Sequence, residues 1–269
     1  MTSPAVPADP AYGVLLRARS GSDVVVDLPL GHGQDPELLL NRAGWRIERP
    51  VSAVREGNGA VSIEYAVRAA SPCSPPQRLI GPEPVVLRRR GVVGRDDGLE
   101  LAEGEEPVRR QRVSAAVLVV AEVPAGVRDS LGRAGPGGRC VLATRYSGAA
   151  LRWDGTWGLP GGGLNEAEHP AVAARREALE ETGQDVIVGE LAFVQSAHWV
   201  GRSPRGVAED FHAVRLVYRG ECAAPADVVV HDLGGTTSEA AWVRVDRAAQ
   251  VDWAPGPAEQ LRALGVLAD

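Results

Sequence analysis

Residues 161–183 constrain the fold of this chain more than any other segment. The segment opens with Gly161, Gly162 and Gly163 and then continues into a stretch with the start and stop signals of a helix. Pro170 suits the first turn of a helix and Gly183 suits its C-terminal stop. The sequence therefore predicts a helix of about three to four turns between these two residues.

Three acidic residues are expected to lie on one side of this helix. At about 100° per residue, Glu177, Glu180 and Glu181 fall within one arc. The opposite side is expected to pack against the rest of the protein, through Ala171, Val172, Ala178 and Leu179. Like charges at this spacing cost about 0.2–0.5 kcal/mol each, so the cluster favours a compensating cation. Oxygen ligands, with no histidine or cysteine at zinc spacing, indicate Mg²⁺ or Mn²⁺. The alternative is an ordinary solvated helix surface.

The segment resembles the Nudix box, in which a glycine, five residues, Glu, seven residues, Arg-Glu, two residues, Glu-Glu, one residue and Gly follow one another. Every fixed place is filled, by Gly162, Glu168, Arg176, Glu177, Glu180, Glu181 and Gly183. Two apolar places differ, because Ala178 is small and Gln184 is polar. The flanks from Trp157 to Gly162 and from Ser238 to Val243 are similar to the family's usual entry and late strand. The resemblance covers residues 110–269.

The resemblance implies an α/β fold, a Nudix-type α/β/α sandwich with a mixed sheet. It also implies a hydrolase that cleaves a diphosphate linkage in a nucleoside diphosphate derivative or nucleoside triphosphate, by attack of water on phosphorus. Glu177 and Glu181 would bind the metal, and Glu180 would be a further ligand or the base. The Gly162 carbonyl would complete the metal shell. Arg176 and Glu168 would form a structural ion pair, and Gly183 would end the helix.

Several residues outside the box are weaker candidates. Glu209 is a candidate for an additional catalytic acid, with a solvated loop acid as the alternative. Arg145 could bind a substrate phosphate. Trp157 and Phe211 are further candidates for substrate binding, and aromatic residues of this kind could also belong to the core. His198 and His212 are at no ligand spacing, so we expect both to be structural.

A different pattern precedes residue 71 and predicts a small α+β domain over residues 11–70. Asp35 and Pro36 open a helix that Gly44 ends, and the turn at Asn58 and Gly59 predicts a hairpin. The expected strands are Tyr12–Arg17, Asp23–Leu28, Trp45–Val54 and Val61–Val67. Residues 1–10 are expected to be a disordered tail, and residues 71–109 a proline-rich linker to the domain at 110–269.

Composition limits the partners. The chain has 269 residues, a net charge of −6 and no lysine, which argues against polymeric nucleic acid and excludes a Walker A lysine. No apolar run is long enough to span a membrane, and no signal peptide is seen, so we expect a cytoplasmic protein. A small nucleotide-like substrate is the expected partner, and a homodimer is left open. The alternative function is a module on the same fold that senses a nucleotide-like ligand without cutting it.

Overall fold

The computed structural model describes residues 13–71, 73–85, 94–96, 99–148, 153–203, 206–231 and 235–268. The tail expected at residues 1–10 lies outside these ranges. Residue contacts divide the chain into two compact units. The N-terminal unit consists of Met1–Val113 and Ser196–Val214, and the box unit consists of Ser114–Gln195 and Arg215–Asp269. Residues 196–214 therefore group with the N-terminal residues, although the sequence assigned them to the domain at 110–269.

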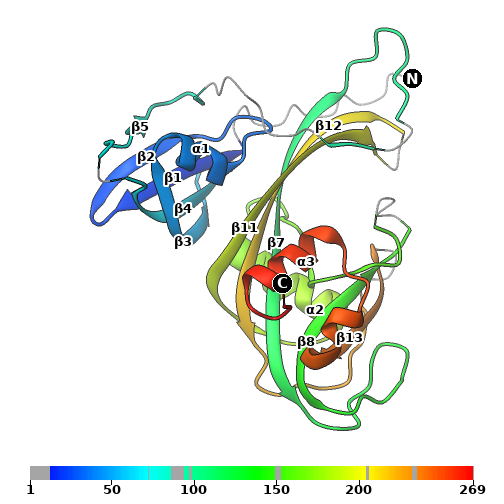
Figure 1. The fold of residues 1–269 in the computed structure, drawn as a ribbon. Coiled ribbons are helices and arrows are strands. Elements are labelled where there is room, and N and C mark those ends of the chain that lie inside the picture. The colour runs from blue at the N-terminus through cyan, green and yellow to red at the C-terminus, as the bar shows by residue number, and fades with distance from the viewer. Residues whose placement is uncertain are drawn as a thin grey trace. The chain divides into compact units, whose positions relative to one another are not determined.

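The N-terminal unit contains a mixed five-stranded sheet in the order β3-β4-β1-β2-β5 (Figure 1). Two pairs of neighbours are antiparallel, β1 with β2 and β3 with β4. The other two pairs are parallel, β1 with β4 and β2 with β5. The elements are β1 (Val14–Ser20), β2 (Asp23–Pro29), α1 (Pro36–Arg42), β3 (Trp45–Arg55), β4 (Val61–Ala69) and β5 (Leu79–Ile80).

Local signals in the sequence explain most of these elements. Alternate residues of β1 are buried, which gives the sheet one packed face. The Asp35 side chain caps α1 by accepting a hydrogen bond from Leu38 N at 2.8 Å. The hairpin between β3 and β4 turns at Gly59, whose φ is +87°. The helix and the four strands expected before residue 71 are thus confirmed.

The proline-rich segment is not wholly without pairing. Its residues Leu79–Ile80 form β5 at the edge of the sheet, and Gly94–Arg95 form β6, which pairs in parallel with Trp199 and Val200. Pro76 and Pro82 lie on either side of β5 and are consistent with its length of two residues.

The box unit is built on strands in the order β13-β8-β7-β12-β11, to which β9 and β10 add short pairings. Strands β7, β11 and β12 contribute residues to both units. The elements are β7 (Val108–Val123), β8 (Gly138–Tyr146), β9 (Trp157–Gly158), β10 (Gly161–Gly163), α2 (Pro170–Thr182), β11 (Ile187–Arg202), β12 (Ala208–Glu221), β13 (Thr237–Arg244), the 3₁₀ helix η1 (Val245–Gln250) and α3 (Pro255–Ala263). The expected α/β fold with mixed sheets, preceded by a small α+β module, is confirmed.

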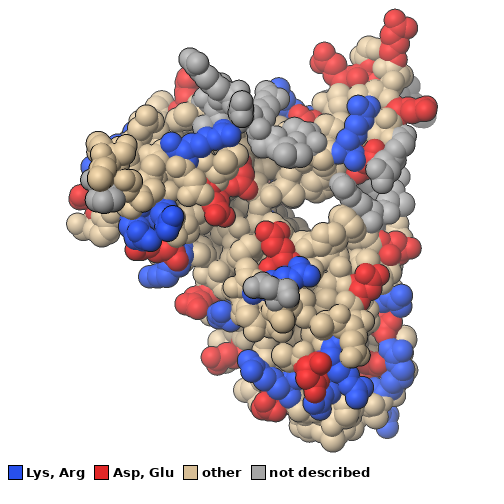
Figure 2. Space-filling view, in the orientation of Figure 1, with Lys and Arg blue, Asp and Glu red and all other residues tan. Residues whose placement is uncertain are grey.

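The core of the box unit is made by apolar strand residues and by the C-terminal helices. Fully buried members include Leu118, Val141, Leu159, Val217 and Leu261. No helix among the described residues is long and apolar enough to cross a membrane. Figure 2 shows acidic and basic side chains interspersed on the face drawn.

Candidate active site

The helix that carries the box acids has the predicted ends. The His169 side chain caps its start, because Nδ1 accepts a hydrogen bond from Ala171 N at 3.3 Å. Gly183 ends it with a φ of +71°, in the left-handed region that favours glycine. The Gly183 N–H donates to the Leu179 carbonyl at 2.9 Å. The helix α2 is therefore bounded by the two residues that the sequence singled out.

The face that α2 buries agrees with the predicted one at Ala178 and differs from it at Val172 and Leu179. Val172 and Leu179, expected to pack, are 57% and 46% exposed, whereas Glu181 is 4% exposed. The buried apolar residues are small, namely Ala173, Ala174 and Ala178. Alanine leaves room for close approach, so the face that carries these alanines and Glu181 packs against the rest of the box unit. The expectation for Val172 and Leu179 was therefore wrong, since it weighed hydrophobicity above side-chain volume.

Glycines bring a strand directly against this helix. Strand β10 pairs with β7, with Gly161 opposite Ala116 and Gly162 opposite Ala115. A side chain at residue 162 would collide with the carboxylate of Glu177, and one at residue 161 would collide with the β7 backbone. Only glycine fits at residue 161, where the obstructing atoms belong to the backbone, whereas a side chain at residue 162 would displace the Glu177 carboxylate. Strand β10 thus carries the Gly162 carbonyl, the predicted backbone ligand, beside the acidic helix.

Glu181 is the most deeply buried acid of the box. Its Oε2 accepts a hydrogen bond from Gly161 N at 2.9 Å, and its Oε1 accepts one from the hydroxyl of Thr237. Burial raises the pKa of Glu181 to about 7, against the effect of these two hydrogen bonds. The nearby charge of Glu177 raises this pKa further. A cation at this place would therefore stabilise the ionised carboxylate.

Arg176 connects the acids of the box to the preceding loop. Its guanidinium donates to both oxygens of Glu168, at 2.8 and 2.9 Å, and to the carbonyl of Gly163 at 3.0 Å. It also donates to Glu177 at 2.7 Å and to Glu180 at 2.9 Å. The hydrogen bonds with Glu168 raise the pKa of Arg176 above its usual range. This bidentate contact fixes the loop to the helix, and the same guanidinium orients two of the acids.

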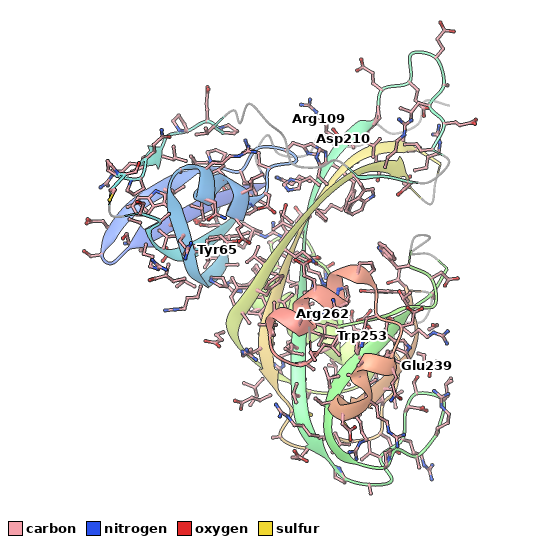
Figure 3. The ribbon with its side chains drawn as sticks, in the orientation of Figure 1. Tyr65, Arg109, Asp210, Glu239, Trp253 and Arg262 are labelled. Carbon is pink, nitrogen blue, oxygen red and sulfur yellow. The ribbon has the colours of Figure 1, made fainter. Side chains whose placement is uncertain are left out.

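Two other predicted residues lie in the box unit. Arg145, on β8, donates from Nε to the Gly155 carbonyl at 2.7 Å and lies 3.4 Å from Glu239 Oε2. Its side chain is 44% exposed. Trp157 is partly buried against the core and its backbone forms a bridge to Trp253. Trp253 is labelled in Figure 3. Arg145 is thus accessible from solvent, whereas Trp157 has a packing role.

The remaining two predicted residues lie in the N-terminal unit. Glu209 Oε1 is 3.7 Å from Arg110 Nε, and its side chain is 18% exposed. Phe211 contacts Trp199, with ring centroids 4.6 Å apart and planes tilted by 39°. The structure therefore brings Glu177, Glu180, Glu181 and Gly162 together in one unit and places Glu209 and Phe211 in the other.

Sequence reasoning missed two partners of Glu181. Thr237 donates its hydroxyl to this carboxylate from the start of β13. Arg215, on β12, donates to the Leu159 carbonyl at 3.1 Å and to the Tyr146 hydroxyl at 3.2 Å, and its charge lowers the pKa of Glu181. The Arg215 Nε is buried without a hydrogen-bond partner among the described residues. No local motif marks either residue, because both act through the fold of distant strands.

Gln184 shows why a polar residue is tolerated at a place that is usually aliphatic. It is 2% exposed, and its side chain donates to the Asp227 carbonyl at 3.2 Å. Its Oε1 accepts from Ala226 N at 3.1 Å. The buried amide is therefore satisfied, and it holds the segment before β13 against the end of α2.

Comparison with known proteins agrees with the box. The family model described as NUDIX domain matches residues 130–264, half of the chain. A similar curated protein is the nucleoside triphosphatase NudI of Salmonella arizonae, 26% identical over 136 residues, which are 48% of this chain and 89% of NudI.

Solved structures that match part of the chain include the MutT protein from Methanosarcina mazei Go1, at 20% identity and a TM-score of 0.39, covering 59% of this chain and 94% of that one. The Nudix hydrolase RenU from M. smegmatis has 22% identity and a TM-score of 0.40, covering 60% and 89%. The family match over residues 130–264 contains the whole box with its acids, its arginine and both of its glycines. This chain therefore belongs to the Nudix hydrolase family.

Proposed function

We propose that this protein hydrolyses a diphosphate linkage in a nucleoside diphosphate derivative or a nucleoside triphosphate. The observation that carries the proposal is the buried Glu181 carboxylate, held by Gly161 N–H and Thr237 beside the like charge of Glu177. Burial of the ionised Glu181 carboxylate beside a like charge is costly, and a further cation would reduce that cost. Nucleoside triphosphates are included because the relative NudI is named a nucleoside triphosphatase.

The donor set fits a hard divalent cation. Glu177, Glu181 and the Gly162 carbonyl offer only oxygen atoms, which Mg²⁺ and Mn²⁺ prefer. Glu180 would be a further ligand or the base that takes a proton from water. When bound, such a cation polarises the water and neutralises charge on the phosphate oxygens.

The chain's own residues hold this arrangement in place. Arg176 orients Glu177 and Glu180 through its hydrogen bonds, and it joins them to Glu168 in the loop. Gly161 N–H and the Thr237 hydroxyl fix the Glu181 carboxylate in one rotamer. Arg145, whose side chain is exposed, would bind a substrate phosphate. We propose the cytoplasm as the compartment, in line with three cysteines that form no disulfide.

The proposal is tested by incubating the full chain with a panel of nucleotide sugars, dinucleotides and nucleoside triphosphates, with Mg²⁺ or with a chelator. Products are separated by chromatography. We expect cleavage of at least one compound at its diphosphate linkage, with full loss of activity in the chelator and recovery on adding Mg²⁺ or Mn²⁺. Turnover that persists in the chelator would exclude the metal-dependent mechanism. Binding of a panel member without any cleavage would instead show a ligand-sensing module.

A further inference from the structure

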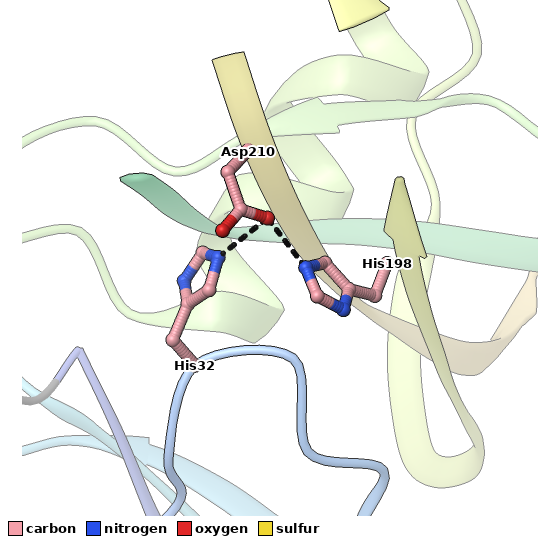
Figure 4. A group of neighbouring side chains, drawn as sticks. All are labelled: His32, His198 and Asp210. Atoms are coloured by element: carbon pink, nitrogen blue, oxygen red, sulfur yellow. Dashed lines mark hydrogen bonds and ion pairs between the residues drawn. The ribbon is translucent and has the colours of Figure 1, made fainter. Parts of the chain in front are cut away.

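Three side chains of types that can bind a metal lie close together, entirely within the N-terminal unit. His32 is in the loop after β2, His198 is on β11 and Asp210 is on β12. Their ligand atoms all lie within 4.8 Å of one another. Figure 4 shows both imidazole rings directed at the same carboxylate. The box chemistry uses none of these three residues.

The two histidines share a single oxygen atom. Asp210 Oδ1 is 2.5 Å from His198 Nε2 and 3.2 Å from His32 Nε2. The exposed fractions of the three side chains are only 8% for His198, 18% for Asp210 and 19% for His32. His32 Nε2 is buried, and despite the short distance its geometry does not make a hydrogen bond. Among the described residues this buried nitrogen therefore has the Asp210 oxygen nearby but no well-formed hydrogen bond, which is unfavourable and leaves its lone pair available to a metal.

The loop that carries His32 is shaped to reach His198. Gly33 has a φ of +70°, and a side chain there would overlap the ring of His198. Gln34 fixes the loop from both sides, because its Nε2 donates to the Val85 carbonyl at 2.5 Å and its Oε1 accepts from Gly31 N at 2.8 Å. The position of His32 is therefore set by the loop backbone and does not depend on the carboxylate alone.

Among the described residues, neighbouring polar groups leave three protein ligands in the cluster. His212 is close to both other histidines, but its Nδ1 is 2.9 Å from Gln111 Nε2 and its Nε2 is 3.1 Å from the Ser196 hydroxyl. Both of its nitrogens are thus already occupied. Arg109 approaches the other oxygen of Asp210, Oδ2, at 4.0 Å, with a side chain that is 70% exposed (Figure 3). Oδ1 remains directed at the histidines.

We propose that His32, His198 and Asp210 bind a zinc ion, with a solvent molecule as the fourth ligand. Two imidazole nitrogens and one carboxylate oxygen suit zinc and do not suit Mg²⁺, which prefers oxygen ligands only. Zinc–ligand bonds of about 2.0–2.2 Å place tetrahedral ligand atoms roughly 3.3 Å apart. The separation of 3.2 Å between His32 and Asp210 already matches this value, and His198 has to move away from Asp210 by under ~1 Å.

The proposed ion would stabilise the N-terminal unit, because it would tie the loop after β2 to strands β11 and β12. Zinc that binds only the folded arrangement contributes its binding free energy to folding. The site also differs in chemistry from the box, so the two sites select different metals. Zinc binding and Mg²⁺-dependent turnover are therefore separable properties of this protein.

The test uses the full chain, freed of metal by dialysis and then given zinc. Metal content is measured by mass spectrometry after removal of unbound ions. We expect one zinc per chain in the natural protein, and a loss of affinity of ~100-fold or more in His32→Ala and Asp210→Asn. His231→Ala is the matched control, because His231 is exposed and lies in the box unit. A Glu177→Gln, Glu181→Gln double variant should keep its zinc.

Spectroscopy on the natural protein decides the question even if a variant does not fold. Cobalt in place of zinc should give the strong visible absorption of a tetrahedral ion, and zinc X-ray absorption should show scattering from two imidazole rings. Absence of both signals would overturn the proposal and leave a hydrogen-bonded His–Asp–His cluster. Equal zinc content in His32→Ala, Asp210→Asn and the natural protein would also overturn it, by placing the metal elsewhere.

Discussion

Glu181 and Glu168 are the same amino acid in opposite surroundings. Glu181 is buried, and apart from its hydrogen bonds to Gly161 and Thr237 it faces the like charge of Glu177. Glu168 is bound through both oxygens by the guanidinium of Arg176. Among the described residues, the Glu181 carboxylate forms no salt bridge, whereas the Glu168 carboxylate is paired with a guanidinium. The same substitution should therefore affect different properties at the two positions.

We predict that Glu177→Gln and Glu181→Gln lower kcat by several orders of magnitude and leave the fold intact, because each removes a charge from the proposed metal ligands. Glu168→Gln should instead cost about 1–3 kcal/mol of stability and a modest part of the rate, because it weakens the contact with Arg176. Steady-state kinetics and thermal melts separate the cases. An equal collapse of kcat in Glu168→Gln with unchanged Tm would place Glu168 in the metal site.

At the scale of the element, α2 is oriented by its small residues. Ala174 is fully buried, whereas Leu179 is 46% exposed. We predict that Ala174→Leu destabilises the protein by ~1–3 kcal/mol through overpacking. Leu179→Gln should change the free energy of unfolding by no more than ~0.5 kcal/mol, as expected of a surface site. Urea unfolding of the two variants measures both values. A larger loss for Leu179→Gln than for Ala174→Leu would restore the face predicted from hydrophobicity.

The parts of the fold that the sequence predicted are those governed by neighbours along the chain. Pro170 and Gly183 marked the ends of α2, and Asn58 with Gly59 marked a hairpin, because caps and turns depend on a few adjacent residues. The box acids could likewise be predicted, since their spacing is local.

What could not be predicted depends on contacts between distant segments. Thr237 reaches Glu181 only after β13 has paired with β8, and nothing in its local sequence marks that role. His32 lies in the loop after β2, His198 on β11 and Asp210 on β12, so only the fold brings the three together. The sequence around His32 shows no metal-ligand motif, because the three residues are far apart in the sequence and become neighbours only in the folded unit.

At the scale of the whole molecule, the chain crosses between its two units more than once. The N-terminal unit takes Ser196–Val214 from the middle of the second half of the chain, while the box unit holds the acids. Within the N-terminal unit, Ser196 donates to the Gln34 carbonyl at 3.4 Å and Gly94 pairs with Trp199. The ends of β11 and β12 thus depend on residues that precede Val108.

This dependence leads to a prediction for a shortened chain. We predict that a protein beginning at Val108 still folds its box unit and keeps metal-dependent turnover, because the box acids and their partners Gly161, Thr237 and Arg215 all lie in that unit. Residues 196–214 should lose protection from amide hydrogen exchange, since His32, Gln34 and the β6 pairing are gone.

Three measurements on one sample test this prediction. Circular dichroism reports folding, hydrogen exchange by mass spectrometry reports the protection of residues 196–214, and the turnover assay reports activity. The full-length chain is the control for each of them. Retained structure with lost turnover would mean that the N-terminal unit takes part in the reaction. Glu209 would be the first candidate to substitute, because the shortened chain keeps it in the segment that is expected to lose its order. A chain without regular structure would mean that the box unit cannot form before the N-terminal strands are in place, and that the two units fold as one.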